Sequence, residues 1–522
     1  MIITACTSNE NQNKLQQLRL NIKEEPTSLD PRRGRNMSGA SQIHAMLFEG
    51  LMKLDPNGKL LPAQASSYDI SADQKTYTFH IADTFWSNGT PVTAYDFEQT
   101  WKNILDPKFP ALDAHLLYNV VNAAAAKQGL VSLDSVGIHS KDAKTLVVEL
   151  ENPTPHFLFI TASSCLFPIN QKQDKHHPNW YVEANEHFTC NGPFKLAKWR
   201  HHNEMILEKN KKYRLADQVH LNSIQIHMIA NEPATLHMYE SDKLDIIGLP
   251  ISPLPIDAYP GFIEKKQLKL FESPGTMVSM FNTKQFPFYN VNMRKAFSYA
   301  INRKMLIENV TQLEERPALG LIPPIVKNGK AQALMEDGNL DQARMFFELG
   351  LKELGITRED LHDKITFSYW THDHACPTLP QALQQQWKDA LGVEVVLEAL
   401  EYKTLHDKGR NEQFSMGYFV FLSMYHDPIE LLDRFKYASN PRNYGRWQND
   451  TYVSLVNQAA QATTQEEHAH FMEEAEQVMM AEMPFAPVFH WNYALLVKPH
   501  VKGFTVTPQG YLYFDNVSIE PL

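Results

Sequence analysis

The segment from Phe85 to Pro107 (FWSNGTPVTAYDFEQTWKNILDP) constrains the local fold more than any other part of the chain. The run 87–89 (Ser-Asn-Gly) predicts a tight turn, because Asn and Gly accept a positive φ at little steric cost. Thr93, followed three residues later by Asp96, predicts a capped helix start. Apolar side chains then recur at helical spacing on one face: Phe97, Trp101, Ile104 and Leu105. Periodicity alone therefore predicts an extended segment, a turn and an amphipathic helix that ends at Pro107.

Size and composition limit the classes of protein to which the chain can belong. With 522 residues it exceeds the usual size of one hydrophobic core, so we expect two or three domains. A hydrophobic share of 43% and a charged share of 21% are typical of globular proteins. The net charge of −11 disfavours nucleic acid and anionic membrane surfaces as partners. We find no apolar run of about 18 residues, so the sequence predicts no transmembrane helix.

Helical and extended patterns alternate along the rest of the chain. Alternating apolar residues predict strands at 77–81 and 223–228. A third strand is expected at 393–400, after a helix with the apolar residues Leu383, Trp387 and Leu391. This order of elements indicates the mixed α/β class.

Two further segments have clear local signals. Asn290 is expected to cap a helix. The apolar face of that helix comprises Met293, Ala296, Phe297, Ala300 and Ile301. Four prolines within residues 249–260 predict a loop, because proline lacks the backbone donor that regular structure needs.

Several motifs extend this local interpretation to a family. The residues of 85–107 resemble the signature of the extracytoplasmic solute-binding proteins of the oligopeptide/dipeptide/nickel class, which serve ATP-binding-cassette (ABC) importers. Ser28–Pro31 and Leu47–Leu51 look like the "SLDP…LFEGL" opening of that family. Further matches follow in the family's order at residues 77–81, 191–196, 281–283 and 294–303. The resemblance therefore spans nearly the whole chain.

The resemblance implies an α/β, two-lobed periplasmic-binding-protein fold (type II, large cluster) with an extra domain inserted in the first lobe. On this basis we expect a three-part division: lobe I at 1–47, 170–271 and 490–522, the extra domain at 48–169, and lobe II at 272–489. The family also leads us to expect a monomer without a cofactor.

The function implied by the resemblance is that of a receptor. Such a protein captures short oligopeptides or peptide-like solutes in the cleft between its lobes and delivers them to an inner-membrane ABC permease. Family members bind a peptide as an added strand through main-chain hydrogen bonds, and the lobes close around it. The alternatives are a receptor of the same fold for a metal chelate or haem, and a surface interaction or adhesion protein.

An enzyme is not expected. The chain lacks the GxSxG, HExxH, GxxxxGK[ST] and GxGxxG motifs. His468, His470 and Glu474 lie in a glutamate-rich helical pattern, for which we expect an exposed face.

The segment 418–428 (YFVFLSMYHDP) is the most informative about the ligand. It resembles the family's "W-x-x-D-Y-x-(D/E)-P" motif, in which the first Asp pairs with the α-ammonium of the peptide. Tyr425 and Asp427 match that motif, but Met424 occupies the position of the ammonium-binding Asp. Three accounts are open: another acid such as Asp427 or Glu430 serves, the ligand has a blocked or distant amine, or the ligand is not a peptide. Asp427 can equally be a turn residue.

Other ligand-binding candidates follow from the family alignment. Within the segment 418–428, Phe421 and Ser423 are candidates in addition to Met424, Tyr425 and Asp427. Near the start of the chain, the backbone after the SLDP turn contacts the ligand in the family, which implies Arg35, Asn36 and Met37. Arg446 is a candidate for a ligand carboxylate. For both arginines a solvated surface role is the alternative.

A histidine-rich stretch follows Tyr369. In the family this region reaches the ligand cavity, which implies His374 and Cys376 as ligand-binding residues. His372, His374 and Cys376 are also of the types that bind metals, but their spacing is not a recognised metal motif. A solvated loop is the third interpretation.

The cysteines bear on the compartment. Ile3–Cys6 resembles a bacterial lipobox, which implies lipidation of Cys6 and a periplasmic or extracytoplasmic lipoprotein; the alternative is an unmodified cysteine in a polar tail. Cys165 and Cys190 form a disulfide in one interpretation and stay free buried thiols in the other.

Overall fold

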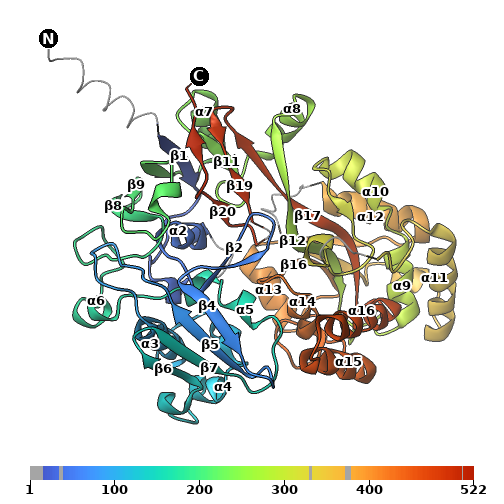
Figure 1. Ribbon diagram of the computed structural model, residues 1–522. Helices are drawn as coiled ribbons and strands as arrows, with labels where there is room; N and C mark the ends of the chain where they lie inside the picture. The colour runs from blue at the N-terminus through green and yellow to red at the C-terminus, as the bar shows by residue number, and fades with distance from the viewer. Residues whose placement is uncertain (1–15, 35–38, 328–331, 371–377, 508, 522) are drawn as a thin grey trace. The chain divides into compact units, whose positions relative to one another are not determined.

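The computed structural model describes residues 16–34, 39–327, 332–370, 378–507 and 509–521 (Figure 1). The chain forms two compact units. Unit 1 comprises Met1–Tyr259, Lys266–Lys269 and Ala494–Leu522, and unit 2 comprises Pro260–Lys265 and Leu270–Tyr493. Strands β12 (Leu268–Phe281) and β17 (Phe485–Val497) each run from one unit into the other. The further division of the first unit at residues 48 and 169 stays a prediction.

Unit 1 contains a mixed sheet with strand order β17–β11–β1–β10–β9–β8. Its strands are β1 (Gln17–Ile22), β8 (Phe194–Arg200), β9 (Glu204–Lys209), β10 (Ser223–Met228) and β11 (Ile246–Gly248), with the end of β17. β1 runs parallel to β10 and β11, whereas β8 and β9 are antiparallel to their neighbours. The strand predicted at 223–228 is confirmed as β10.

A second, antiparallel sheet of unit 1 has the order β4–β5–β7–β6. These strands are β4 (Ala65–Ile70), β5 (Thr76–Ile81), β6 (Ile138–Asp142) and β7 (Thr145–Glu149). β5 confirms the strand predicted at 77–81, and its residues alternate between buried and half-buried. The smaller strands of the unit are β2 (Met52–Leu54), β3 (Leu60–Pro62), β18 (Val501–Lys502), β19 (Thr505–Val506), β20 (Leu512–Tyr513) and β21 (Ser518–Ile519).

Helix α3 (Ala94–Leu105) contacts β6 and β7 of this second sheet and has the predicted start. Thr93 and Asp96 form a capping box in which the Asp96 carboxylate accepts the Thr93 backbone N–H at 2.9 Å. The four predicted apolar residues are all buried. The other helices of unit 1 are α2 (Gly39–Leu47), α4 (Ala123–Lys127), α5 (Phe157–Ile160), α6 (Gln171–His176) and α7 (Glu232–Glu240).

Unit 2 has a sheet of order β15–β14–β16–β12–β17. Strand β14 (Thr366–Trp370) pairs in parallel with β15 (Val396–Leu400) and β16 (Met416–Leu422), and β16 pairs antiparallel with β12. The short β13 (Arg316–Pro317) pairs with β17. The strand predicted at 393–400 begins only at Val396, because Gly392 ends the preceding helix with φ of +66° and residues 393–395 continue from that turn.

Helices surround this sheet and supply two apolar clusters. They are α9 (Val291–Tyr299), α10 (Arg303–Leu306), α11 (Leu340–Leu354), α12 (Leu379–Leu391), α13 (Tyr402–Arg410), α14 (Ile429–Leu432), α15 (Asp450–Gln461) and α16 (Gln465–Glu482). Asn290 caps α9 as predicted, since its side chain accepts the Met293 N–H at 3.0 Å. All five residues of the predicted apolar face are buried.

The loop prediction for residues 249–260 is wrong at its end. A short 3-10 helix (Ile256–Ala258) and helix α8 (Tyr259–Glu264) begin there. Pro260 fits because it lies in the first turn of α8, where a backbone N–H has no intrahelical partner to lose. Among the described residues no helix is both long and apolar enough to cross a membrane.

Candidate ligand-binding segments

Two of the family motifs pack against each other in unit 1. The Gly192 N–H donates to the Leu47 carbonyl at 2.8 Å. The Asn191 side chain holds both backbone polar groups of Glu49, accepting its N–H at 3.1 Å and donating to its carbonyl at 3.0 Å. A Cβ on Gly192 would lie 2.6 Å from backbone atoms of Leu47 and Phe48, so this close contact requires glycine. The motifs therefore form one structural junction.

The Glu49 carboxylate is the charged centre of that junction. It accepts from the Tyr213 hydroxyl at 2.7 Å, from Arg214 Nε at 2.7 Å and from Gln64 Nε2 at 2.9 Å. Burial opposes its charge, but Arg214 and Lys53 together lower the pKa of Glu49 below its ordinary value. The carboxylate therefore stays ionised although it is buried.

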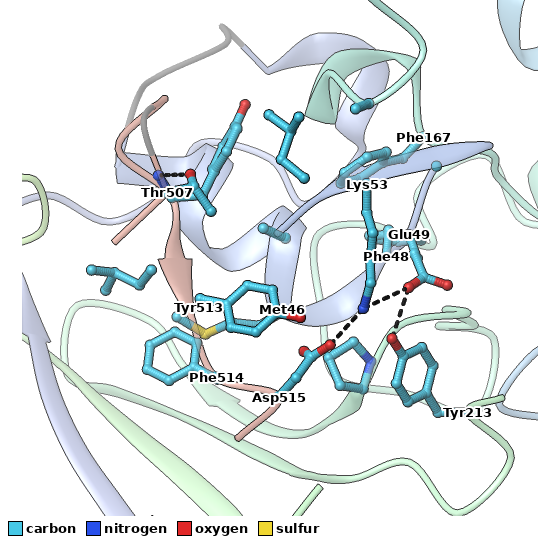
Figure 2. A pocket seen from close by; sticks show the side chains of 17 residues that line it. Met46, Phe48, Glu49, Lys53, Phe167, Tyr213, Thr507, Tyr513, Phe514 and Asp515 are labelled. Carbon is cyan, nitrogen blue, oxygen red and sulfur yellow. Dashed lines mark hydrogen bonds and ion pairs between the residues drawn. The ribbon is translucent and has the colours of Figure 1, made fainter. Parts of the chain in front are cut away.

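A cavity of about 80 Å³ lies beside this carboxylate (Figure 2). Its walls are mostly apolar, and include Met46, Phe48, Leu54, Phe167, Leu512 and Phe514. At its charged side Lys53 Nζ lies 2.7 Å from Asp515 Oδ2 and 3.7 Å from Glu49 Oε1. A space of this size holds a few water molecules and is too small for a peptide.

The SLDP turn holds a second buried ion pair in unit 1. Asp30 is fully buried and caps a 3-10 helix (Pro31–Arg33). Arg32 contacts Asp30 at 2.8 Å and Asp174 at 2.7 Å. Arg33 lies 3.3 Å from Asp30 as well, and its guanidinium lies over the ring of Phe109 at 4.8 Å. Arg32 is therefore a structural residue of this turn.

The segment after β16 in unit 2 begins with two buried candidates. Phe421 is 3% exposed and packs edge-on against Phe435 at 5.4 Å between ring centres. Ser423 is fully buried; its N–H donates to the Pro274 carbonyl at 2.9 Å and its hydroxyl donates to the Tyr425 carbonyl at 2.6 Å. These two residues hold the end of the strand and the turn that follows.

Met424 and Tyr425 lie on that turn and are half-buried. They are more accessible than the buried candidates Phe421, Ser423 and Asp427. Burial and the neighbouring carboxylates, Glu430 foremost, raise the pKa of Tyr425 well above 10, so its hydroxyl stays neutral. The turn thus presents a thioether and a neutral phenol.

Asp427 is buried and engaged with helix α16. Both of its carboxylate oxygens lie 3.0 Å from His468 Nε2, and one accepts the Ile429 N–H at 2.9 Å at the start of α14. The expectation of an exposed face at His468 is wrong, because this residue is 3% exposed. His470, on the same helix, is exposed and lies 3.6 Å from Glu474.

Glu430, the other acid of this segment, is also buried and paired. Its carboxylate contacts Arg434 at 2.6 Å and Arg442 at 2.9 Å. Burial would raise the pKa of Glu430, but the two guanidiniums lower it below its ordinary value. Arg434 also donates to the Leu422 carbonyl at the end of β16. One carboxylate with two guanidiniums gives this cluster a net charge of +1.

Arg446 holds a backbone turn in unit 2. It has a positive φ of +54°, and its guanidinium donates to the carbonyls of Ala438 and Asn440 at 3.1 and 3.2 Å. An ion pair with Glu412 at 3.0 Å completes the arrangement. Its charge is therefore already used within the unit.

The remaining predicted residues are partly outside the described chain. Arg35, Asn36, Met37, His372, His374, Cys376 and Cys6 all lie outside the described residues. Within the part that the structure describes, no group of three or more His, Cys, Asp or Glu is placed to hold a metal ion. Cys165 and Cys190 are free buried thiols, and burial raises the pKa of Cys190 to about 12.

Sequence reasoning missed the partners that organise these segments. His468 carried a usable signal, since it precedes the buried Met472, Ala475 and Met479 by four, seven and eleven residues. No comparable signal joined Glu49 to Arg214, because the two are 165 residues apart.

Known proteins resemble this chain over most of its length. The family described as "Bacterial extracellular solute-binding proteins, family 5 Middle" matches residues 59–443. The chain is 36% identical to the oligopeptide-binding protein OppA of Bacillus subtilis, over 96% of this chain and 92% of that protein. It is 30% identical to YgiS of Escherichia coli, a probable deoxycholate-binding periplasmic protein, over 97% of this chain and 94% of that protein.

A solved structure extends this likeness to three dimensions. Haemophilus influenzae OppA in complex with the peptide RPPGFSPFR superposes with a TM-score of 0.77 at 27% identity, over 97% of this chain and 99% of that one. The predicted periplasmic-binding-protein fold is thereby confirmed. This chain belongs to the bacterial extracellular solute-binding proteins of family 5.

Proposed function

We propose that this protein is the solute-binding receptor of an ABC importer and that it captures short oligopeptides or peptide-like solutes. The observation that carries the proposal is similarity over nearly the full length to oligopeptide-binding proteins, one of them with a bound nonapeptide. Receptors of this family bind and release a solute without chemical change, so no catalytic residues are needed. The proposed partner is the inner-membrane permease that accepts the solute.

The turn after β16 supplies the proposed ligand contacts in unit 2. Met424 and Tyr425 would contact the solute directly, because they are half-buried whereas the other candidates of this segment, Phe421, Ser423 and Asp427, are buried. Phe421, Ser423 and Asp427 would hold the turn in place. The other proposed contacts are Arg35, Asn36, Met37, His374 and Cys376, whereas Arg446 would support the turn that its guanidinium holds.

The charges around Met424 favour a solute without a free ammonium at this turn. Asp427 is engaged with His468, and Glu430 with two arginines. A buried ammonium without a carboxylate would cost several kcal/mol. The relative YgiS, described as a probable deoxycholate-binding protein, is consistent with a family site that does not require an amine. We therefore propose N-blocked peptides or other amine-free solutes as preferred ligands.

The family supports an extracytoplasmic location. We propose in addition that Cys6 is lipidated and anchors the protein to a membrane. Intact mass spectrometry of the protein from membrane fractions would test the anchor: a diacylglyceryl mass on Cys6 is expected, and an unmodified Cys6 would contradict it.

Native mass spectrometry of the purified protein is the first test of the receptor function. Short peptides, or peptides with a blocked amino terminus, should dissociate from the protein on denaturation. A single metal-containing mass would instead favour the chelate or haem receptor. Titration with RPPGFSPFR and its N-acetylated form would follow, because the pair differs only in the terminal amine.

Met424→Asp tests the role of the turn. The carboxylate should raise the affinity for free-amine RPPGFSPFR about tenfold or more, since hydrogen bonds to charged groups contribute roughly 1.5–3 kcal/mol. The N-acetylated form should gain nothing. Isothermal titration calorimetry provides the measurement. Equal affinities of wild type and variant for the free peptide would show that Met424 does not face the solute amine.

A further inference from the structure

His468 occupies a buried position between two hydrogen-bond acceptors. Its Nδ1 lies 2.7 Å from the Ala459 carbonyl of α15, and its Nε2 lies 3.0 Å from both carboxylate oxygens of Asp427. The side chain is 4% exposed. Water therefore does not replace either contact.

The geometry fixes the number of protons in this pair. A carbonyl only accepts, so Nδ1 must carry a hydrogen. A neutral imidazole would then present a lone pair on Nε2 to a carboxylate, which is repulsive. An imidazolium facing the carboxylate satisfies all of these atoms. Burial alone would lower the pKa of His468, but its bond to Asp427 raises it above the ordinary value.

Asp427 transmits this contact to the turn after β16. Its carboxylate also accepts the Ile429 N–H at 2.9 Å, and its own N–H donates to the Tyr425 carbonyl at 2.8 Å. The same carbonyl accepts the Ser423 hydroxyl. Through these bonds the position of Asp427 determines the course of the backbone on both sides of Met424.

We propose that protonated His468 is a positioning residue for the solute site: it clamps Asp427 to α16 and thereby holds the Met424–Tyr425 turn, and loss of its proton loosens the turn and weakens solute binding. This inference rests on the proposed function. It assigns His468 a regulatory role without contact to the solute.

Other titratable groups near the pair do not change charge in the same range. His426, beside Asp427, has its pKa lowered by burial, so it is neutral above about pH 6.5. The pKa of Tyr425 lies well above 10. Glu430 of α14 is ionised between its two arginines, and α15 contributes the Ala459 carbonyl. Titration of the His468–Asp427 pair above the ordinary pKa range of histidine is therefore assigned to His468.

Two substitutions separate the proton from the hydrogen bond. His468→Gln keeps a donor toward Asp427 that does not titrate, whereas His468→Leu removes it. His470→Gln, on the exposed side of the same helix, is the matched control.

The affinity of the full-length protein for N-acetyl-RPPGFSPFR, measured from pH 6.5 to 9, is the first readout. Wild type and the control should lose about threefold to tenfold in affinity as pH rises, the size expected for one hydrogen bond. His468→Gln should bind nearly as wild type at pH 6.5 and stay constant to pH 9. His468→Leu should bind weakly throughout. A pH profile of His468→Gln equal to that of wild type would overturn the proposal.

Hydrogen exchange in the solute-free protein tests the role of His468 independently of the proposed function, because it requires no bound solute. Protection of the 423–429 amides, corrected for intrinsic rates, should fall with rising pH in wild type and stay constant in His468→Gln. If neither peptide binds but this difference is present, the clamp stands and the proposed function fails. Equal exchange in both proteins would overturn the clamp, whatever the peptides do.

Discussion

Glu49 in unit 1 and Glu430 in unit 2 are both buried carboxylates that contact two cationic side chains, but their charge balance differs. Around Glu49, the cations are Arg214 and Lys53, and Asp515 pairs with the second of them, so the group is neutral. This group lies where two family motifs meet, and each of its four charged side chains forms an ion pair within unit 1.

Around Glu430 the balance is positive. Arg434 and Arg442 face a single carboxylate, and the Arg442 side chain is 37% exposed. Arg434 of this cluster donates to the Leu422 carbonyl, two residues before Met424, where the sequence predicts a departure from the family motif. The family motif around Glu49 is kept, and its charges are balanced within the protein. The segment around Met424 departs from its motif, and the nearby Glu430 cluster has one positive charge in excess.

Removal of the charge on Glu49 should have the largest effect. Glu49→Gln removes the buried carboxylate, so the half-buried Arg214 loses its ion-pair partner and Lys53 keeps only Asp515. The free energy of unfolding should fall by about 3–5 kcal/mol. Urea denaturation followed by circular dichroism measures it. Glu208→Gln, at a half-exposed side chain of the same unit, is the control and should change stability by less than about 0.5 kcal/mol. A similar small change at Glu49 would contradict the structural role of this carboxylate.

The stability difference between wild type and Glu49→Gln should depend on pH. The folded pKa of Glu49 is lowered, so its ionised form stabilises the protein above the unfolded value of about 4.3 and this contribution is lost as pH falls through the folded pKa. The stability difference between wild type and Glu49→Gln should therefore be full at about pH 6 and shrink below about pH 4. A difference that is constant down to acid unfolding would show that the charge of Glu49 is not its source.

Gly192→Ala tests the contact between the motifs directly. The added Cβ would lie 2.6 Å from the backbone of Leu47 and Phe48, and backbone atoms cannot rotate away. Unfolding stability should fall by about 1–3 kcal/mol. Gly39→Ala, where a Cβ meets no atom within 4 Å, is the matched control and should be neutral or slightly stabilising. Thermal denaturation of both variants measures the difference.

The smallest effect is expected for Arg442→Ala, which makes the Glu430 cluster neutral like that of Glu49. Stability should change by at most about 1 kcal/mol, because more than a third of this side chain is exposed. Arg200→Ala, which removes an exposed partner of Glu204, is the control. A urea-denaturation loss well above 2 kcal/mol would place Arg442 among the structural residues and remove the proposed contrast between the two clusters.

Local elements were predictable because their signals lie within a few residues. The capping box of α3, the cap of α9 and the strand β10 depend on neighbours three or four positions away, and all three were found as expected. Errors arose where tertiary contacts compete with local pattern. The helical pattern around His468 contains many glutamates, yet this histidine faces inward because Asp427 compensates its burial.

The sequence by itself determined the family, the α/β class and the departure at Met424, since these depend on residue identity and short-range order. Only the tertiary structure decided that Asp427 and Glu430 are already paired, and that Glu49 joins Tyr213 and Arg214. The physical reason is that a buried charge needs a partner in space, whereas spacing along the chain reports only neighbours within one helix or strand.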